Sequence, residues 1–258
     1  MKIAYAGFDL FYPALEALHQ NGCEIVKIFS CRVDNVTEFN TRVTDFANTH
    51  NIPITYDKIT LDDLTELKNS GVDALFCAAY YYRMPILSGF KMINIHPSLL
   101  PIGRGAWPMP VCILNDYKTS GVTLHKMAEG FDTGEIIMQK EFALAPDENL
   151  DSFMGKIYAL LPDMIKELTS NLDYYWDNAK AQGEGEYWTA PDERDYIITP
   201  DTDYYAASKI LRAFYGFYVI YNDGEKEHRL LRHLAQKGEN KDAKYKVRGG
   251  YLEALHIQ

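Results

Sequence analysis

The sequence predicts an α/β fold with a Rossmann-like, mostly parallel sheet, helices on both faces, and a small C-terminal β subdomain. Two observations predict it. In the first hundred residues, short apolar runs alternate with stretches whose apolar residues recur every three or four positions. After residue 204, short strand-like runs are separated by turn residues such as Asn222-Asp223-Gly224. The glycines and prolines of residues 183–203 mark a linker. We therefore expect a main domain at 1–182 and a shortened OB-like subdomain at 204–258.

The individual elements follow from periodicity and from turn residues. Gly7 is expected to end the first strand, and Pro13 suits the first turn of a helix that Gly22 follows. Pro162 is expected to kink or break a helix that begins near residue 150. The predicted strands of the main domain are 2–7, 24–30, 73–79, 93–96, 122–127 and 135–144, with a turn at 119–121. Helices are predicted at 13–21, 61–69 and 106–115, and a further helix is predicted to run through Phe39, Val43 and Phe46. The subdomain is predicted to hold a helix at 205–214 and strands at 217–221, 229–235 and 251–257.

The strand at 93–96 carries two polar side chains on one face. Side chains alternate across a strand, so Asn94 and His96 point the same way, and Pro97 ends the strand because it cannot donate to a ladder. In open α/β sheets, ligands bind at the carboxyl ends of the strands. The sequence therefore predicts a site at this end, beside the proline- and glycine-rich loop 98–108.

An Asn-x-His pair alone is typical of a structural hydrogen bond, and Asp132-Thr133-Gly134 alone is typical of a turn. The compound motif is more specific. Residues 94–101, Arg104-Gly105 and 132–134 together resemble the 10-formyltetrahydrofolate-dependent formyltransferases. The resemblance is strongest over 73–161 and closest to sugar N-formyltransferases of the 4-amino-arabinose lipid A type. It implies catalytic roles for Asn94, His96 and Asp132.

The resemblance also implies binding residues. The formyl donor is expected to be 10-formyltetrahydrofolate as co-substrate, with its pterin ring along the main chain of one segment and beside a second. The cofactor-binding residues are Met84, Pro85, Ile86, Ala128, Glu129, Gly130 and Phe131. The expected acceptor contacts are Phe8, Ser98, Arg104 and Trp107. Where the similar sugar enzymes carry a second arginine, this chain has Ala106, so any contact of that side chain is lost or replaced.

The three catalytic side chains suit formyl transfer to an amine. Asn94 offers a neutral amide donor for a developing oxyanion. His96 can donate to that oxyanion or carry protons, and Asp132 can orient His96 or relay a proton. Which of His96 and Asp132 is the formal base stays open. The chemistry needs no metal, and we expect none. We interpret His125 as a structural histidine, and His228 and His233 as surface residues.

Composition narrows the function classes. The net charge is −10 and no cluster of Lys and Arg is evident, which disfavours a nucleic-acid partner. No apolar run approaches a membrane span, and the N-terminus reads as a strand rather than a signal peptide, so we expect a cytoplasmic protein. The four cysteines show no C-x-x-C spacing, and no G-x-G-x-x-G follows the first strand.

The acceptor follows only by elimination within the resembled family. The segment 7–10 lacks the glycine-rich phosphate loop of glycinamide ribonucleotide enzymes, and 32–38 lacks the basic insertion of tRNA enzymes. Folate deformylases usually carry an extra N-terminal domain. An amino sugar, nucleotide-linked, is the expected acceptor, and a homodimer is compatible with this. An amino acid or peptide-synthetase-type formyltransferase, a methionyl-tRNA formyltransferase and an inert folate-binding regulator stay open as alternatives.

Overall fold

The computed structural model describes residues 1–257, which form two compact units. Unit 1 comprises Met1–Arg104, Gly121–Glu141 and Lys156–Tyr187. Unit 2 comprises Gly105–Ser120, Phe142–Gly155 and the chain from Trp188 onward. The chain last passes from unit 1 to unit 2 inside the predicted linker at 183–203. Two stretches of the predicted main domain, however, belong to unit 2, because they pack with the C-terminal elements.

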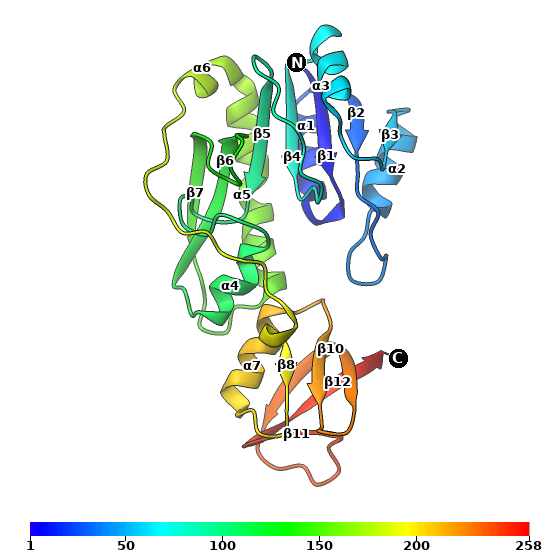
Figure 1. Cartoon of the computed structure of the whole chain (residues 1–258), viewed down its shortest axis with the longest axis vertical. Helices are drawn as coiled ribbons and strands as arrows, with labels where there is room; N and C mark the ends of the chain where they lie inside the picture. The colour runs from blue at the N-terminus through cyan, green and yellow to red at the C-terminus, as the bar shows by residue number, and fades with distance from the viewer. Residues whose placement is uncertain (258) are drawn as a thin grey trace. The chain divides into compact units, whose positions relative to one another are not determined.

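Unit 1 is built on the predicted mostly parallel sheet (Figure 1). Its strand order is β3-β2-β1-β4-β5-β6-β7, with β3 to β5 parallel and β6 antiparallel to β5. All residues of β4 are buried, as expected for a parallel sheet covered on both faces. The strands are β1 Lys2–Gly7, β2 Glu24–Phe29, β3 Ile54–Thr55, β4 Ala74–Ala78, β5 Lys91–His96, β6 Thr119–Lys126 and β7 Ile136–Ala143.

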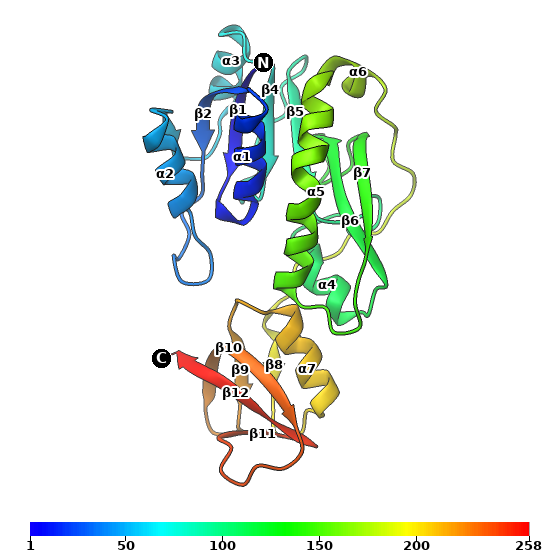
Figure 2. The same cartoon turned by 180° about the vertical axis from the view of Figure 1, so that it is seen from behind.

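Helices cover both faces of this sheet. Figure 2 shows α1 (Tyr12–Gln20) and α5 (Leu150–Ser170) on one face. On the other face, Leu64 and Leu67 of α3 (Leu61–Asn69) join a core cluster with residues of β1, β4 and β5. The helix begins where predicted because Thr60 and Asp63 form a capping box. Unit 1 also contains the helices α2 (Thr41–Thr49) and α6 (Leu172–Asp177).

Three local predictions were wrong. Pro162 does not break α5, whose buried stripe continues on both sides of it, through Ile157 and Ile165. Burial of that stripe outweighs the one helical hydrogen bond that proline cannot make. The predicted turn at 119–121 is the start of β6. A Cβ at Gly121 would overlap the carbonyl oxygen of Lys140, so this glycine marks a close approach within the sheet rather than a bend.

The third wrong prediction concerns Phe39, which lies before α2 rather than in it. The helix begins after Asn40 because the Asp9 carboxylate accepts hydrogen bonds from the backbone N–H groups of Arg42 and Val43. A carboxylate at a helix N-terminus satisfies donors that have no partner inside the helix. The start of α2 is thus fixed by a residue more than thirty positions away.

Unit 2 holds the predicted β subdomain as a five-stranded sheet of order β11-β12-β10-β9-β8. Helices α4 (Pro108–Leu114) and α7 (Tyr204–Ala213) pack together, and the Lys209 ammonium pairs with Asp116. Part of the predicted linker is ordered as β8 and a 3-10 helix, Glu193–Asp195, neither of which was predicted. The strands are β8 Ile197–Ile198, β9 Val219–Asn222, β10 Glu227–Lys237, β11 Tyr245–Val247 and β12 Gly250–Ile257.

His233 is buried, so the prediction of a surface histidine was wrong. Its Nε2–H donates to the carbonyl of Phe217 at 3.1 Å. The cause is a bulge in β10 between Leu231 and Leu234, where Arg232 has a φ of 51°. A bulge shifts the alternation of side chains by one residue, which turns His233 inward and Leu234 outward. His228 is partly buried beside Asp223.

All four cysteines are buried, free thiols. Within residues 1–257, no helix combines the length and the apolar character needed to cross a membrane.

Two glycine substitutions test the packing at the end of β1. A Cβ at Gly7 would overlap the carbonyl oxygen of Ala78 in the neighbouring strand, whereas a Cβ at Gly155 in α5 meets nothing within 4 Å. We expect Gly7→Ala to lower the free energy of unfolding by about 3 kcal/mol. Gly155→Ala should raise it by about 0.5–1 kcal/mol, because alanine loses less backbone entropy in a helix. Urea unfolding of both variants measures this. Equal effects of the two substitutions would contradict the packing at β1 and β4.

Candidate active site

The three predicted catalytic residues lie together in unit 1. Asn94 and His96 come from the carboxyl end of β5, and Asp132 lies in the loop between β6 and β7. The Asn94 Nδ2 lies 3.2 Å from Asp132 Oδ1, and His96 Nδ1 lies 3.7 Å from Asp132 Oδ2. The Asp132 side chain is only 12% exposed. The site therefore joins one strand end and one loop around a nearly buried carboxylate.

Both N–H groups of the Asn94 amide are directed at protein acceptors. One donates to Asp132 Oδ1 and the other reaches His125 Nε2 at 3.1 Å. The reverse orientation of the amide would point its oxygen at the carboxylate, which is unfavourable. The network thus fixes which way the amide faces.

His96 is almost fully buried, and its ring is fixed by a backbone carbonyl. A carbonyl only accepts, so His96 Nε2 carries the proton that bonds to Gly103 O at 2.7 Å. In the neutral ring, Nδ1 then presents a lone pair toward Asp132. Burial lowers the pKa of His96 below its usual value, and the nearby Asp132 charge opposes this. The ring is therefore held neutral with its free nitrogen facing the carboxylate.

His125 belongs to the same cluster, which sequence reasoning did not predict. It lies directly opposite Asn94 in the antiparallel pairing of β5 and β6. Its Nδ1–H donates to the Lys126 carbonyl at 2.8 Å, so Nε2 is free to accept from Asn94 and lies 3.4 Å from Asp132 Oδ1. The residue is structural in the sense predicted, yet its partners are the catalytic candidates.

Asp132 adopts a left-handed backbone conformation, with a φ of 53°. This region is unfavourable for a residue other than glycine, although Asp and Asn tolerate it best. The next glycine is equally constrained, because a Cβ at Gly134 would overlap the carbonyl of Lys126. The backbone of the turn that carries the carboxylate is therefore constrained at both Asp132 and Gly134.

The two predicted folate-binding segments lie side by side. Arg83 precedes the first segment, 84–86, and its guanidinium donates to the carbonyl of Glu129 at 3.2 Å. The same guanidinium lies over the ring of Phe131, 5.8 Å from its centroid. The side chain of Met84 is buried against the core, whereas Phe131 is exposed. One arginine therefore links the segments that the resemblance singled out.

The four predicted acceptor contacts have separate partners, three of them in unit 1 and one in unit 2. Phe8 is buried and packs on Tyr81, and the buried Ser98 hydroxyl donates to the Ile102 carbonyl of its own loop. Arg104 bonds Gln182 through its guanidinium. Trp107 belongs to unit 2, where it packs edge-on against Phe214 and Phe217. Their acceptor role stays a prediction.

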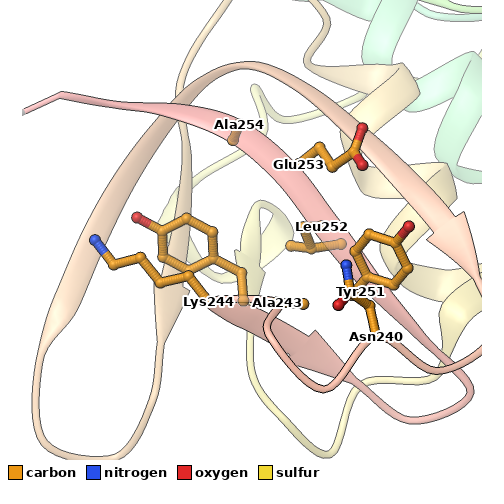
Figure 3. Close-up of a pocket in the computed structure, with 8 residues that line it drawn as sticks. Asn240, Ala243, Lys244, Tyr251, Leu252, Glu253 and Ala254 are labelled. Carbon is orange, nitrogen blue, oxygen red and sulfur yellow. The ribbon is translucent and has the colours of Figure 1, made fainter.

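Two further features bear on what the chain could bind. Among residues 1–257, no group of three or more His, Cys, Asp and Glu side chains is placed to hold a metal ion. Unit 2 contains a cavity of about 370 Å³ at its sheet, which includes none of the predicted site residues (Figure 3). The cavity is lined by Asn240, Ala243, Lys244, Tyr245, Tyr251, Leu252, Glu253 and Ala254.

Comparison with known proteins identifies the family of this chain. The model of the family described as formyl transferase matches residues 38–167, which include Asn94, His96 and Asp132. Among curated relatives, the methionyl-tRNA formyltransferase of Alkaliphilus oremlandii is 31% identical over 215 residues. That match covers 78% of this chain and 67% of the relative.

Solved structures share the fold at lower identity. A Helicobacter canadensis N-formyltransferase, in complex with folinic acid and dTDP-3-aminofucose, has a TM-score of 0.69 and 19% identity, with both chains covered completely. HypX from Aquifex aeolicus, in complex with tetrahydrofolic acid, has a TM-score of 0.75 and 14% identity, and this chain spans 43% of its length. The family match over half of the chain and the relative at 31% identity establish that this chain belongs to the formyl transferase family.

Proposed function

We propose that the chain is an N-formyltransferase that moves a formyl group from 10-formyltetrahydrofolate to the amine of a small molecule, an amino sugar linked to a nucleotide. The observation that carries the proposal is the nearly buried contact of Asn94 and His96 with Asp132 at the carboxyl end of β5. A buried carboxylate with an amide donor and a neutral imidazole supplies the groups that acyl transfer to an amine requires.

In the proposed reaction, the neutral amine forms a bond to the formyl carbon, and the bond from that carbon to N10 of the folate breaks. The intermediate between these steps carries an oxyanion. Asn94 can stabilise it only by releasing one of its two present hydrogen bonds, to His125 or to Asp132. A proton on Asp132 would weaken the second bond, so proton uptake by the carboxyl group and donation by Asn94 are coupled.

A proton must leave the attacking nitrogen, and one must reach N10. His96 Nδ1 and Asp132 face each other with lone pairs, so a proton that leaves the amine meets two adjacent acceptors there. The pair can therefore take the proton from the amine and return it to the leaving nitrogen. The two groups act as a unit in this scheme.

Folate binding is supported by the segments joined through Arg83. Residues 84–86 take part in no backbone–backbone hydrogen bond with the rest of the described chain, so the N–H groups of Met84 and Ile86 and the carbonyls of all three are candidates to bond the edge of a flat ring. Two proteins of the same fold are solved with tetrahydrofolic acid or folinic acid. These residues fit 10-formyltetrahydrofolate as the formyl donor.

A small acceptor is supported by charge. The loop between β2 and α2 is short, and its Asp34 accepts backbone hydrogen bonds from Val36, Thr37 and Glu38. Burial raises the pKa of Asp34, but its hydrogen bonds together outweigh this effect and lower the pKa to about 2. A fixed negative charge there and a net charge of −10 disfavour a polyanion. The Helicobacter canadensis structure, which contains an amino sugar nucleotide, supports the same choice.

Methionyl-tRNA is the second candidate acceptor, and specific observations favour it. The relative at 31% identity is a methionyl-tRNA formyltransferase. In addition, residues 204–258 carry ten Lys and Arg against six Asp and Glu, so this part of the acidic chain is basic. Basic side chains could contact a phosphate backbone. Cytoplasmic location and a homodimer stay predictions from the sequence.

The acceptor is tested with purified protein, 10-formyltetrahydrofolate and parallel acceptors: nucleotide-linked amino sugars, free amino acids and methionyl initiator tRNA. We expect release of tetrahydrofolate with an amino sugar nucleotide, and at most a background rate with the tRNA at physiological salt. The Asp132→Ala variant gives the blank. Robust formylation of the tRNA would overturn the small acceptor, whereas no turnover with any amine would overturn the proposed reaction.

The protonation of His96 is tested by its NMR titration in protein with isotope-labelled histidine. Burial outweighs the charge of Asp132, so the titration midpoint should lie below 6.5. Asp132→Asn removes the opposing charge and should move the midpoint to lower pH. By linkage, the contribution of His96 to the free energy of unfolding is fully present above pH 6.5, where the ring is neutral in both states. As pH falls below 6.5 the free energy of unfolding decreases, because the unfolded chain takes up the proton before the folded one. A wild-type midpoint above 6.5 would contradict the neutral ring.

A further inference from the structure

The side chain of Gln182 is bonded to the main chain of the Asp132 turn. Its Nε2 group donates to the carbonyl of Asp132 at 2.8 Å and to the carbonyl of Gly134 at 2.6 Å. Both amide N–H groups are thereby used on the two carbonyls that flank the Asp132–Gly134 turn. Gln182 lies 50 residues beyond Asp132 in the sequence and was not among the predicted site residues.

The amide oxygen of Gln182 is held by Arg104. It accepts from Arg104 Nε at 3.0 Å and from Nη2 at 2.9 Å, and Nη2 also donates to the Gly183 carbonyl at 3.0 Å. The guanidinium leaves the Gln182 amide only one favourable orientation, since a reversed amide would set donors against donors at Arg104 and oxygen against the two carbonyls. The Arg104 guanidinium therefore fixes the orientation of the Gln182 amide.

The segment that carries Gln182 is anchored at both ends within unit 1. At one end, Lys180 and Ile136 of β7 exchange two backbone hydrogen bonds, of 2.7 and 2.8 Å. At the other, the carbonyl of Glu186 accepts from Arg104 N at 3.0 Å, and Glu186 N donates to Pro101 O at 3.1 Å. We name residues 180–187 the strap. It joins the Asp132 turn to the loop whose Gly103 carbonyl holds His96.

The turn needs external support, because its conformation is unfavourable in isolation. A left-handed residue other than glycine costs about 1 kcal/mol, and Asp132 is such a residue. The hydrogen bonds from Gln182 fix the peptide groups after Asp132 and Gly134. Those peptide planes set the direction of the carboxylate toward Asn94 and His96.

We propose that Gln182, held by Arg104, is a positioning residue that keeps the Asp132 carboxylate in its reactive direction. The inference rests on the proposed role of Asp132 in formyl transfer. It gives Arg104 a different role from the predicted acceptor contact: the guanidinium orients Gln182. Neither side chain touches the reacting atoms in this account. Positioning matters because a displacement of about 1 Å can cost up to about a hundredfold in rate.

The test compares three variants of the full chain. Gln182→Met removes both hydrogen-bonding ends at similar volume. Gln182→Glu keeps an acceptor for Arg104 but sets an oxygen against the carbonyls of Asp132 and Gly134. Gln20→Met, at the exposed end of α1, is the matched control. We expect both Gln182 variants to lower kcat about tenfold or more, with the KM for 10-formyltetrahydrofolate within about twofold, and the control to match wild type.

A double-mutant cycle separates positioning from general damage. If Gln182 acts through Asp132, Gln182→Met should have little further effect on kcat in the Asp132→Asn background. A full tenfold loss in that background would overturn the proposal, as would wild-type kcat in either Gln182 variant.

A second readout does not depend on activity. Hydrogen exchange of the peptide covering residues 128–135 should be faster in Gln182→Met than in wild type or Gln20→Met, because the turn loses two hydrogen bonds. Unchanged exchange would overturn the proposal even if the chain proves to have another activity. Exchange could be faster in Gln182→Met while the wild-type protein forms no formamide. That result would refute the proposed function but retain the support of the Asp132 turn by Gln182.

Discussion

The site depends on one amide, that of Asn94, whose two N–H groups hold His125 and Asp132 together. Because both partners are nearly buried, water cannot replace either bond at low cost. The amide thereby connects β5, β6 and the Asp132 turn, three parts of unit 1. Each further feature of the site maintains this contact: two histidines are fixed in one tautomer by backbone carbonyls, and the turn is fixed by Gln182.

The strand order of the sheet explains why the proposed site lies at the carboxyl ends of its parallel strands. The strand order places β1 and β4 side by side, where the chain reverses its direction of winding, and β5 follows next. Ligands of open α/β sheets bind beside this reversal, at the carboxyl ends of the strands. Residues 84–86 follow β4, and the Asp132 carboxylate contacts Asn94 and His96 of β5. The fold thus brings the proposed folate-binding segment and the proposed acid–base pair to the same end of unit 1.

Local sequence determined much of this in advance. The alternation in β5 predicted that Asn94 and His96 share a face, and the pair does meet Asp132. The helix at 61–69 was predicted residue for residue, because the spacing of its leucines is a local signal. Parallel strands and flanking helices followed from periodicity. These predictions, which depend on neighbouring residues, were confirmed.

The remaining features depend on residues distant in sequence. His125 enters the site through the register of β6 against β5, and a shift of one residue would have pointed it to the other face. His233 turned inward because of a bulge that no local pattern announces. Gln182 acts from 50 residues away, in a stretch bordering the predicted linker. In each case the signal was a pairing between segments, which a single sequence does not contain.

The proposed role of Asn94, His96 and Asp132 is to catalyse the transfer of a formyl group to an amine. The most direct measurement uses 10-formyltetrahydrofolate labelled with ¹³C in the formyl group and follows the label by NMR with a primary-amine acceptor. The proposed reaction predicts that the label moves from the folate to a new formamide on the acceptor. It also predicts that His96→Asn, with the wild-type fold, slows this movement by about a hundredfold or more. The proposed reaction would be refuted if the label stayed on the folate or appeared only as free formate. It would also be refuted if a His96→Asn protein transferred the label at the wild-type rate.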